Sequence, residues 1–240
     1  MILLLAGTAE ARMLATDLSR AGIPALASLA GATARPQAMD LPTRIGGFGG
    51  AEGFEAVLEA EAIRAVIDAT HPFARRITNR TAEICARRGL PLLRLERPGW
   101  APGPEDAWTW FDDPEQVAAL TDARTIFLAT GRQDLARYAA LAGRRVYCRQ
   151  IDPPEGAFPF SGGEFVIGRP PFSVEAEKGL FARLAVEALV VKDAGGAASR
   201  TKLDAARALG LPVLIQRRPP SPDVLRVETV AEAMDWVRAI

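Results

Sequence analysis

The chain has 240 residues, with 29 basic and 29 acidic side chains and therefore no formal net charge. This length favours one large domain or two small ones, and a composition of 49% apolar and 24% charged residues is typical of a folded globular protein. The charge balance argues against a general nucleic-acid or membrane-surface binder, and no apolar run is long enough to span a bilayer.

Cysteine and histidine restrict the chemistry further. Cys85 and Cys148 are the only cysteines, and His71 is the only histidine. Without a CxxC pair or a second histidine, we expect neither a disulfide framework nor a metal site. This cysteine usage indicates a reducing compartment, so a cytoplasmic location is expected. No basic segment precedes the short apolar stretch Met1–Ala6, which predicts a buried strand rather than a secretory signal.

Short apolar runs alternate with helical patterns through the first half of the chain. The runs predict strands at Ile2–Ala6, Ala25–Ala30, Arg44–Ile45, Ala65–Ile67 and Leu90–Leu95. Amphipathic spacing predicts helices at 10–21, at 52–62 and around Ile77, Thr81, Ile84 and Cys85. Strands without polar alternation, separated by helices, are typical of a parallel sheet that is covered on both faces.

After a Pro/Gly-rich stretch at Pro98–Pro104 and a short strand at Trp108–Phe111, the same pattern restarts. It predicts further strands at Thr125–Thr130, Val146–Ile151, Glu164–Ile167, Ala188–Val191, Pro212–Gln216 and Leu225–Val227. Helices are expected at Pro114–Leu120, 173–187, 199–209 and 230–239. The sequence therefore predicts an α/β protein with two similar domains, at residues 1–112 and 113–240.

In parallel α/β sheets, ligands bind beyond the carboxyl ends of the strands, where the winding reverses. Gly7, Thr8, Ala9 and Glu10 follow the first strand and begin a helix, a position that suits a pyrophosphate. The motif is not GxGxxG, because Ala9 and Arg12 stand at the second and third glycine positions. A strand-to-helix turn that binds nothing is the alternative.

The end of the second predicted strand bears on the choice of nucleotide. Folds that bind NAD usually carry an acidic residue there, but residues 25–34 contain none. Ser28, Thr33 and Arg35 are present instead and suit a 2′-phosphate, which favours NADPH over NADH if a dinucleotide binds. Gly31 in the same segment is a further candidate for cofactor contact. The alternative is that Arg35 is a solvated loop cation.

Two further loops of the first half are candidates for ligand contact. Gly47, Phe48 and Gly49 lie in a dense glycine loop, which is either a flexible spacer or a packed loop beside a flat ligand. Asp68-Ala69-Thr70-His71-Pro72-Phe73 follows the most central predicted strand. Thr70 and His71 could flank a nicotinamide, and His71, Asp68 and solvent are all candidate proton donors. A purely structural hydrogen-bonding histidine is the alternative.

Polar residues also follow the strands of the second half. Arg132 stands at one predicted strand end, and the next such loop contains Lys192, Asp193, Gly195 and Gly196. Lys202 lies close behind in the sequence. These residues suit an anionic substrate, although Lys202 and Arg207 could equally lie on the solvated face of an ordinary helix.

At this point the motifs, taken in order, resemble those of the precorrin-6A reductase family. The matching segments cover nearly the whole chain: Leu5-Ala6-Gly7-Thr8-Ala9-Glu10-Ala11-Arg12, Arg44-Ile45-Gly46-Gly47-Phe48-Gly49, Asp68-Ala69-Thr70-His71-Pro72-Phe73-Ala74, Leu93-Arg94-Leu95-Glu96-Arg97-Pro98, Thr130-Gly131-Arg132, Pro171-Phe172-Ser173 and Lys192-Asp193-Ala194-Gly195-Gly196. The chain departs from the family pattern at Ala6, where a glycine is usual, and at Ala194, where a serine is common.

This resemblance implies a cobalamin-pathway enzyme that reduces a carbon–carbon double bond of the tetrapyrrole precorrin-6A with NADPH, giving precorrin-6B. It also implies two Rossmann-like domains, one for NADPH and one contributing to substrate binding, with the active site in the cleft between them. Transient contact with neighbouring pathway enzymes is a further expectation. The alternatives left open are an NADH-using reductase of the cobalt-containing intermediate, another Rossmann enzyme such as a methyltransferase, and a non-catalytic nucleotide-binding carrier or sensor.

Overall fold

The computed structural model describes residues 1–31, 37–154, 156–197 and 199–240, so the predicted contacts Thr33 and Arg35 lie outside the described residues. Two compact units make up the fold. The first unit contains Met1–Pro98 and Pro220–Ile240, and the second unit contains Gly99–Pro219. Each unit holds one six-stranded parallel sheet with helices on both faces, as the alternation of apolar runs and helices predicts.

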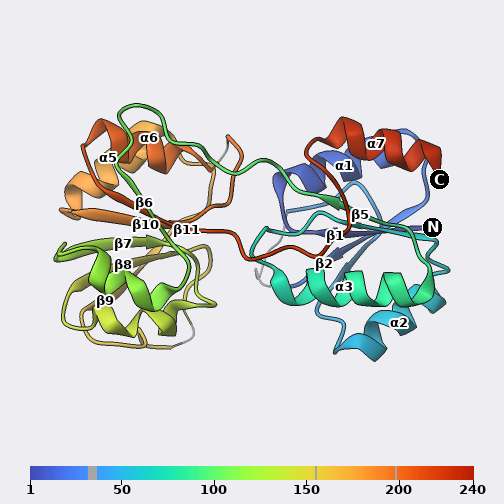
Figure 1. The fold of residues 1–240 in the computed structure, drawn as a ribbon, viewed down its shortest axis with the longest axis horizontal. Helices are drawn as coiled ribbons and strands as arrows, with labels where there is room; N and C mark the ends of the chain where they lie inside the picture. The colour runs from blue at the N-terminus through green and yellow to red at the C-terminus, as the bar shows by residue number, and fades with distance from the viewer. Residues whose placement is uncertain (32–36, 155, 198) are drawn as a thin grey trace. The chain divides into compact units, whose positions relative to one another are not determined.

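The first sheet has the strand order β12-β5-β4-β1-β2-β3. Its strands are β1 (Ile2–Ala6), β2 (Ala25–Leu29), β3 (Thr43–Ile45), β4 (Ala65–Asp68), β5 (Leu92–Leu95) and β12 (Leu225–Val227). Its helices are α1 (Ala9–Arg20), α2 (Ala51–Ala60), α3 (Arg75–Arg88) and α7 (Val230–Ala239). Figure 1 shows α1 and α7 on one face of this sheet and α2 and α3 on the other.

Burial on both faces explains why the strands are continuously apolar. Leu4 in β1 packs in the same core cluster as Leu14 of α1 and Met234 of α7. Its neighbour Leu3 points to the other face and packs with Phe54 of α2. Because successive side chains of a strand alternate between the two faces, neither face of β1 can carry a polar residue without burying it.

The second sheet has the order β6-β11-β10-β7-β8-β9. Its strands are β6 (Trp108–Phe111), β7 (Thr125–Ala129), β8 (Arg145–Gln150), β9 (Gly163–Ile167), β10 (Ala188–Lys192) and β11 (Val213–Gln216). One face carries α5 (Val174–Arg183) and α6 (Thr201–Ala208), and the other carries the short helices η1 (Pro114–Gln116), α4 (Val117–Leu120) and η2 (Leu135–Leu141). The sequence patterns did not predict η2.

The division between the units differs from the predicted boundary after residue 112. Trp108–Phe111 belongs to the second sheet, where β6 pairs with β11. The chain then returns to the first unit after Pro219, so that β12 pairs with β5 and α7 packs against α1. The boundary prediction rested on the break in the pattern at Pro98–Pro104 and the short elements that follow it, but the pairing of parallel strands depends on contacts that are distant in the sequence.

Candidate functional site

The first sheet has its winding reversal at β1, which lies between β2 and β4. At this point the loop after β1 meets the loop after β4. Thr8 Oγ1 donates to the carbonyl oxygen of Ala69 at 2.9 Å and accepts from the backbone nitrogen of Ala11 at 3.1 Å, which caps α1. A Cβ atom on Gly7 would lie 3.8 Å from the backbone nitrogen of His71, an ordinary van der Waals contact. The structure thus brings together the predicted residues of both loops at the edge where α/β sheets bind ligands.

Glu10, also predicted to contact the cofactor, pairs with a cation from another strand end. Its Oε2 atom lies 2.5 Å from Nη1 of Arg97, which follows β5. Ala9 is half-buried beside it in the first turn of α1. The carboxylate at the start of α1 is therefore offset by a guanidinium, which reduces its repulsion of a bound anion.

Asp68 is buried and fully engaged in hydrogen bonds. Its Oδ1 atom accepts from the backbone nitrogen and the hydroxyl of Thr70, at 3.0 and 2.6 Å. Its Oδ2 atom accepts from Nη1 of Arg94 at 2.6 Å. Arg94, itself 1% exposed, also donates to Thr78 and to Glu96. This network joins the ends of β4 and β5, and it fixes Thr70, which directly precedes His71 in the loop after β4.

The imidazole of His71 has a defined orientation. Its Nδ1 atom accepts a hydrogen bond from the backbone nitrogen of Phe73 at 3.2 Å, and its ring lies 5.8 Å from the Phe73 ring. Since Nδ1 is an acceptor, the neutral ring carries its proton on Nε2. Pro72 between them is buried. His71 is partly buried, so it combines a fixed tautomer with partial access from solvent.

Ser28 is buried at the end of β2 and accepts a hydrogen bond of 2.8 Å from Nη1 of Arg44 in β3. Arg44 also donates to the carbonyl oxygens of Gly46 and Gly47 at 3.1 Å each. Gly31 is exposed after β2, with φ of 74°. The sequence reasoning did not single out Arg44, because it was assigned only to a short strand.

The glycine loop after β3 is packed, as one of its two interpretations predicted. The centre of the Phe48 ring lies 4.7 Å from that of the Phe54 ring in α2, and the Arg44 guanidinium carbon lies 4.0 Å from the centre of the Phe48 ring. A Cβ atom on Gly53 would lie 1.8 Å from the carbonyl oxygen of Phe48, so the loop sits directly on the helix. Gly49 follows with φ of 72°. The flexible-spacer interpretation does not agree with these contacts.

The second sheet has a matching reversal at β7, which lies between β8 and β10. Arg132 is exposed after β7, and Nζ of Lys192 at the end of β10 lies 2.7 Å from a carboxylate oxygen of Asp134. Gly195 and Gly196 follow in left-handed conformations. These predicted residues therefore do meet at one strand-end edge of the second unit.

Asp193, which is predicted to bind substrate, is buried and accepts hydrogen bonds within the second unit. Its Oδ1 atom accepts from the backbone nitrogen of Trp100 at 3.0 Å, and Arg218 donates to its carbonyl oxygen at 3.0 Å. Trp100 Nε1 also donates to the carbonyl oxygen of Gly196 at 2.9 Å. These contacts attach the start and the end of the second unit to the loop after β10.

Lys202 lies near the start of α6. Its Nζ atom donates to the carbonyl oxygen of Ser199 at 2.6 Å and lies 5.6 Å from the centre of the Trp100 ring. Burial lowers the pKa of this amine to about 8, with Glu177 acting to raise it and Arg149 acting to lower it. The lysine is therefore not an ordinary solvated helix cation, which was the alternative interpretation. An amine of this kind can change charge near neutral pH.

Arg149 and Glu177 form a second buried pair that the sequence reasoning missed. Nη1 and Nη2 of Arg149 in β8 contact the two carboxylate oxygens of Glu177 in α5 at 2.6 and 2.7 Å. The guanidinium also stacks on Phe172, 4.2 Å from the ring centre. No local sequence signal marks this pair, because its partners come from a strand and a helix that are distant in the sequence.

Neither a metal cluster nor a membrane segment is present in the described ranges. No group of three or more His, Cys, Asp or Glu side chains there could hold a metal ion. The helices formed by the described residues are too short or too polar to cross a membrane. Cys85 and Cys148 are both buried free thiols.

Two parallel sheets, each with a winding reversal and polar strand-end loops, define a Rossmann-like α/β protein of two units. The chain belongs to the precorrin-6x reductase family, since the model described as "Precorrin-6x reductase CbiJ/CobK" matches residues 1–238.

Individual relatives agree with this assignment. A protein named Precorrin-6A reductase from Rhodococcus erythropolis is 44% identical over 240 residues, which cover 98% of this chain and 96% of the relative. One of the same name from Rhodobacter capsulatus is 41% identical over 98% of this chain and 95% of the relative. A solved structure titled "CobK precorrin-6A reductase" is similar at a TM-score of 0.94 and 39% identity, and covers 99% of this chain and 96% of that one.

Proposed function

We propose that this chain is a cytoplasmic, NADPH-dependent precorrin-6A reductase of cobalamin biosynthesis, which reduces one carbon–carbon double bond of the macrocycle to give precorrin-6B. The observation that carries the proposal is similarity over nearly the full length to proteins named for this reaction. The polar residues at the winding reversal of each sheet are consistent with it.

The relatives favour the metal-free macrocycle over its cobalt-containing counterpart. Two relatives named Precorrin-6A reductase are 44% and 41% identical to this chain. A relative named Cobalt-precorrin-6A reductase from Priestia megaterium is 27% identical over 91% of both chains. We therefore take precorrin-6A as the substrate, with the cobalt form as the alternative.

The residues of the first unit fit a phosphorylated dinucleotide. Gly7 leaves room beside the start of α1, whose unpaired backbone amides suit a pyrophosphate. Ser28 and Arg44 stand where folds that bind NAD usually place an acidic side chain. The buried Nε of Arg80 has no partner among the described residues, which is consistent with a site for an anionic group. NADPH, when bound, supplies the hydride.

Reduction of a double bond also requires a proton, and His71 is the better placed of the two predicted donors. In its imidazolium form His71 can donate a proton to the substrate and return to the neutral ring, whose Nδ1 atom accepts from the backbone nitrogen of Phe73. Asp68 accepts hydrogen bonds on both oxygens and is 2% exposed. We therefore assign His71 to proton transfer and Asp68 to positioning the loop through Thr70.

The second unit supplies cations for the carboxylates of the substrate. Arg132 and Lys192 lie at the ends of neighbouring strands, and Lys202 follows on α6. Gly195 and Gly196 leave the backbone open to close approach. Paired guanidinium and ammonium donors are the groups that bind carboxylates most strongly.

The finer parts of this proposal are tested by a two-by-two assay. Initial rates are measured with NADPH and NADH, each with precorrin-6A and with its cobalt-containing form. The proposal predicts that NADPH with the metal-free substrate gives the highest kcat/KM. A higher kcat/KM with NADH, or with the cobalt form, would replace the corresponding part of the assignment.

A further inference from the structure

The motif Pro171-Phe172-Ser173 leads into α5 and determines how that helix begins. Ser173 is the N-terminal cap, since its Oγ atom accepts from the backbone nitrogen of Ala176 at 3.1 Å. The carbonyl oxygen of Ser173 accepts from the backbone nitrogen of Glu177 at 3.1 Å and closes the first turn. The cap therefore fixes the position of Glu177, whose side chain is only 1% exposed.

Arg149 meets Glu177 from the neighbouring sheet. Tyr147, two residues earlier in β8, packs in the same core cluster as Phe181 of α5, so Arg149 points to the same face of the sheet. Its guanidinium donates to both carboxylate oxygens of Glu177, at 2.6 and 2.7 Å. The guanidinium carbon lies 4.2 Å from the centre of the Phe172 ring. The motif thus supplies a stacking ring for the arginine and the cap of the helix that carries its partner.

Lys202 lies beside this pair on α6, which packs against α5 (Figure 1). Glu177 and Arg149 are the two charged groups that act on the pKa of its amine, in opposite directions. The Trp100 ring lies 5.6 Å from Nζ, and the carbonyl oxygen of Ser199 accepts one of the N–H groups. An ammonium group has three N–H donors, so two remain that donate to no described residue.

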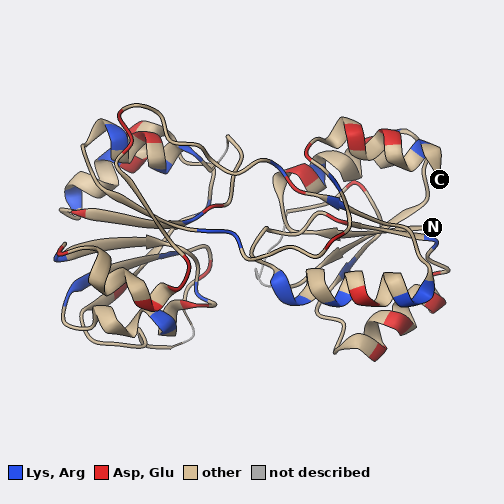
Figure 2. Ribbon diagram, in the orientation of Figure 1, with Lys and Arg blue, Asp and Glu red and all other residues tan. Residues whose placement is uncertain are grey.

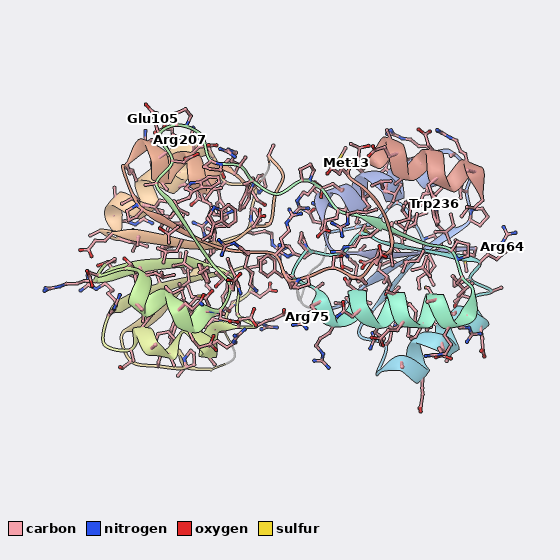
Figure 3. The ribbon with its side chains drawn as sticks, viewed as in Figure 1. Met13, Arg64, Arg75, Glu105, Arg207 and Trp236 are labelled. Carbon is pink, nitrogen blue, oxygen red and sulfur yellow. The ribbon has the colours of Figure 1, made fainter. Side chains whose placement is uncertain are left out.

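The other charged side chains at this helix have different partners. Arg207 lies 2.8 Å from Asp106, and Arg200, directly before α6, lies 3.4 Å from Asp204. Figure 2 shows charges of both signs on α5 and α6, and Figure 3 shows Arg207 at the edge of the second unit, near Glu105. Lys202 is therefore the cation of α6 that forms no ion pair in the described part of the chain.

The Arg149–Glu177 pair favours a charged amine without occupying its donors. Burial opposes the ammonium form of Lys202, and the carboxylate of Glu177 favours it. A glutamate without a partner could bind the amine directly. Both of its oxygens are instead engaged by Arg149, and no ion pair joins Glu177 to Lys202 in the described structure.

We infer that Arg149 and Glu177 are positioning residues for Lys202, and that together they keep its amine charged and open to a carboxylate of the substrate. This inference rests on the proposed function, which assigns Lys202 to substrate binding, and deepens it by giving the two buried residues a role. An ammonium group with unused donors, partly removed from water, binds a carboxylate more strongly than an exposed lysine does.

The charge of Lys202 can be observed directly, without an activity assay. The chain has only three lysines, Lys178, Lys192 and Lys202, so protein labelled with 13C at the lysine Cε atoms gives three signals in an NMR titration. K202R identifies the signal of Lys202 by its absence. The same preparations are used to measure the KM for precorrin-6A as a function of pH.

Three variants test the pair: E177Q, R149Q and the double variant. E177Q removes the charge that favours the ammonium form, so the titration of Lys202 should move to lower pH by about one pH unit. R149Q removes the charge that opposes it, so the titration should move to higher pH by about the same amount. The double variant should fall between the two single variants. In each protein the rise in KM should follow the titration.

Opposite shifts distinguish this role from a structural one, because a variant that only loosens α5 would move both titrations in one direction. E175Q is the matched control, since Glu175 is exposed on the same helix and pairs with Lys178 at 3.0 Å. It should leave the Lys202 titration and the KM profile unchanged. Thermal melts confirm folding, and E177Q with the double variant decides the outcome if R149Q is not folded.

Three results would overturn the inference. Titrations of Lys202 that do not move, or that move in the same direction in E177Q and R149Q, would leave the pair with a structural role alone. Titrations that move as expected while the KM profile stays in place would show that Lys202 does not bind the substrate. A wild-type protein that does not reduce precorrin-6A would overturn the proposed function as well, and the NMR titration tells this case from the first.

Discussion

Arg94 and Asp68, on neighbouring strands of the first sheet, form an ion pair with 2.6 Å between Nη1 and Oδ2, and the two residues are only 1% and 2% exposed. The same guanidinium contacts Glu96, so one buried cation offsets two buried carboxylates. Thr70, directly before His71, donates twice to Asp68. The ion pair therefore links the stability of the first unit to the position of the loop that carries His71.

Substitution of Arg94 should be more damaging than substitution of its partner. We expect R94M to lower the free energy of unfolding by about 3–5 kcal/mol, because it leaves Asp68 and Glu96 buried without their shared cation. D68N retains an acceptor for Thr70 and should lower the free energy of unfolding by less than R94M does. Denaturant unfolding of both variants measures the difference. The control is R238A, whose exposed pair with Asp235 should contribute no more than about 0.5 kcal/mol; equal losses for R94M and R238A would contradict this account.

Gly53 should respond to alanine in the opposite sense from an ordinary helical glycine. A Cβ atom there would lie 1.8 Å from the backbone oxygen of Phe48, so G53A must displace the loop after β3. Gly179 in α5 has nothing within 4 Å of the same position, and G179A should stabilise the protein by up to about 1 kcal/mol. We expect G53A to lower the melting temperature and to weaken NADPH binding. A melting temperature raised by both substitutions would show that the loop is not packed on α2.

Lys202 should make substrate binding depend on pH in the range near 8. Burial lowers the pKa of this amine to about 8, so it is charged below that pH and neutral above it. If the ammonium binds a carboxylate of the substrate, the KM for precorrin-6A should rise as the pH increases through 8. The measurement is KM as a function of pH.

Two variants of Lys202 separate this titration from that of other groups. K202R keeps a positive charge throughout the range, so its KM should lose the rise near pH 8. K202M lacks the charge at every pH and should have a high KM that does not change there. A rise that persists unaltered in K202M would assign the titration to another group.

His71 should affect turnover rather than nucleotide binding. A general acid typically contributes about 100- to 10,000-fold to the rate, so H71A should lower kcat by at least about 100-fold. The dissociation constant of NADPH should change by less than about threefold, since only the proton donor is removed. Steady-state kinetics measures kcat, and titration calorimetry measures the dissociation constant of NADPH. A kcat equal to that of the wild type would remove His71 from the chemistry and leave solvent as the donor.

The local elements could be predicted well where an apolar run is bounded by glycine or proline. The strands Ile2–Ala6, Trp108–Phe111 and Leu225–Val227 and the helix Val230–Ala239 have the bounds expected from sequence. Each is limited by turn residues or by a capping threonine, which are local signals. The seven-residue 3₁₀ helix at Leu135–Leu141 was not predicted, because its side chains at i and i+3 do not follow the α-helical period.

The assignment of elements to units could not be predicted in the same way. β6 and β12 each belong to the sheet other than the one expected from the predicted boundary after residue 112. Both strands are short, and a strand of a few residues carries no information about which distant edge it will join. Pro98 and the Pro219-Pro220 pair lie where the chain passes from one unit to the other. A proline indicates that an element ends there, but it does not indicate which sheet the next strand joins.

The residues of the candidate site also differ in whether local sequence signals could predict them. Gly7, Thr8, Thr70 and His71 could be predicted, because they follow apolar strands and the carboxyl ends of parallel strands share one edge. Arg44 and Arg149 could not, because an arginine in a chain rich in arginine gives no local sign of such contacts. Arg94 alone carried a signal, as it lies between two leucines of an apolar strand.

Hydride transfer from NADPH to precorrin-6A is the central claim, and an isotope experiment tests it most directly. The protein is incubated with precorrin-6A and NADPH that carries deuterium on the transferred position of the nicotinamide, and the product is analysed by mass spectrometry while the nicotinamide absorbance is followed. The account predicts that nicotinamide oxidation and macrocycle reduction proceed together, and that the product contains one deuterium from the nucleotide and one hydrogen from solvent. A reduced macrocycle without that deuterium, or binding of both ligands with no reduction, would contradict it.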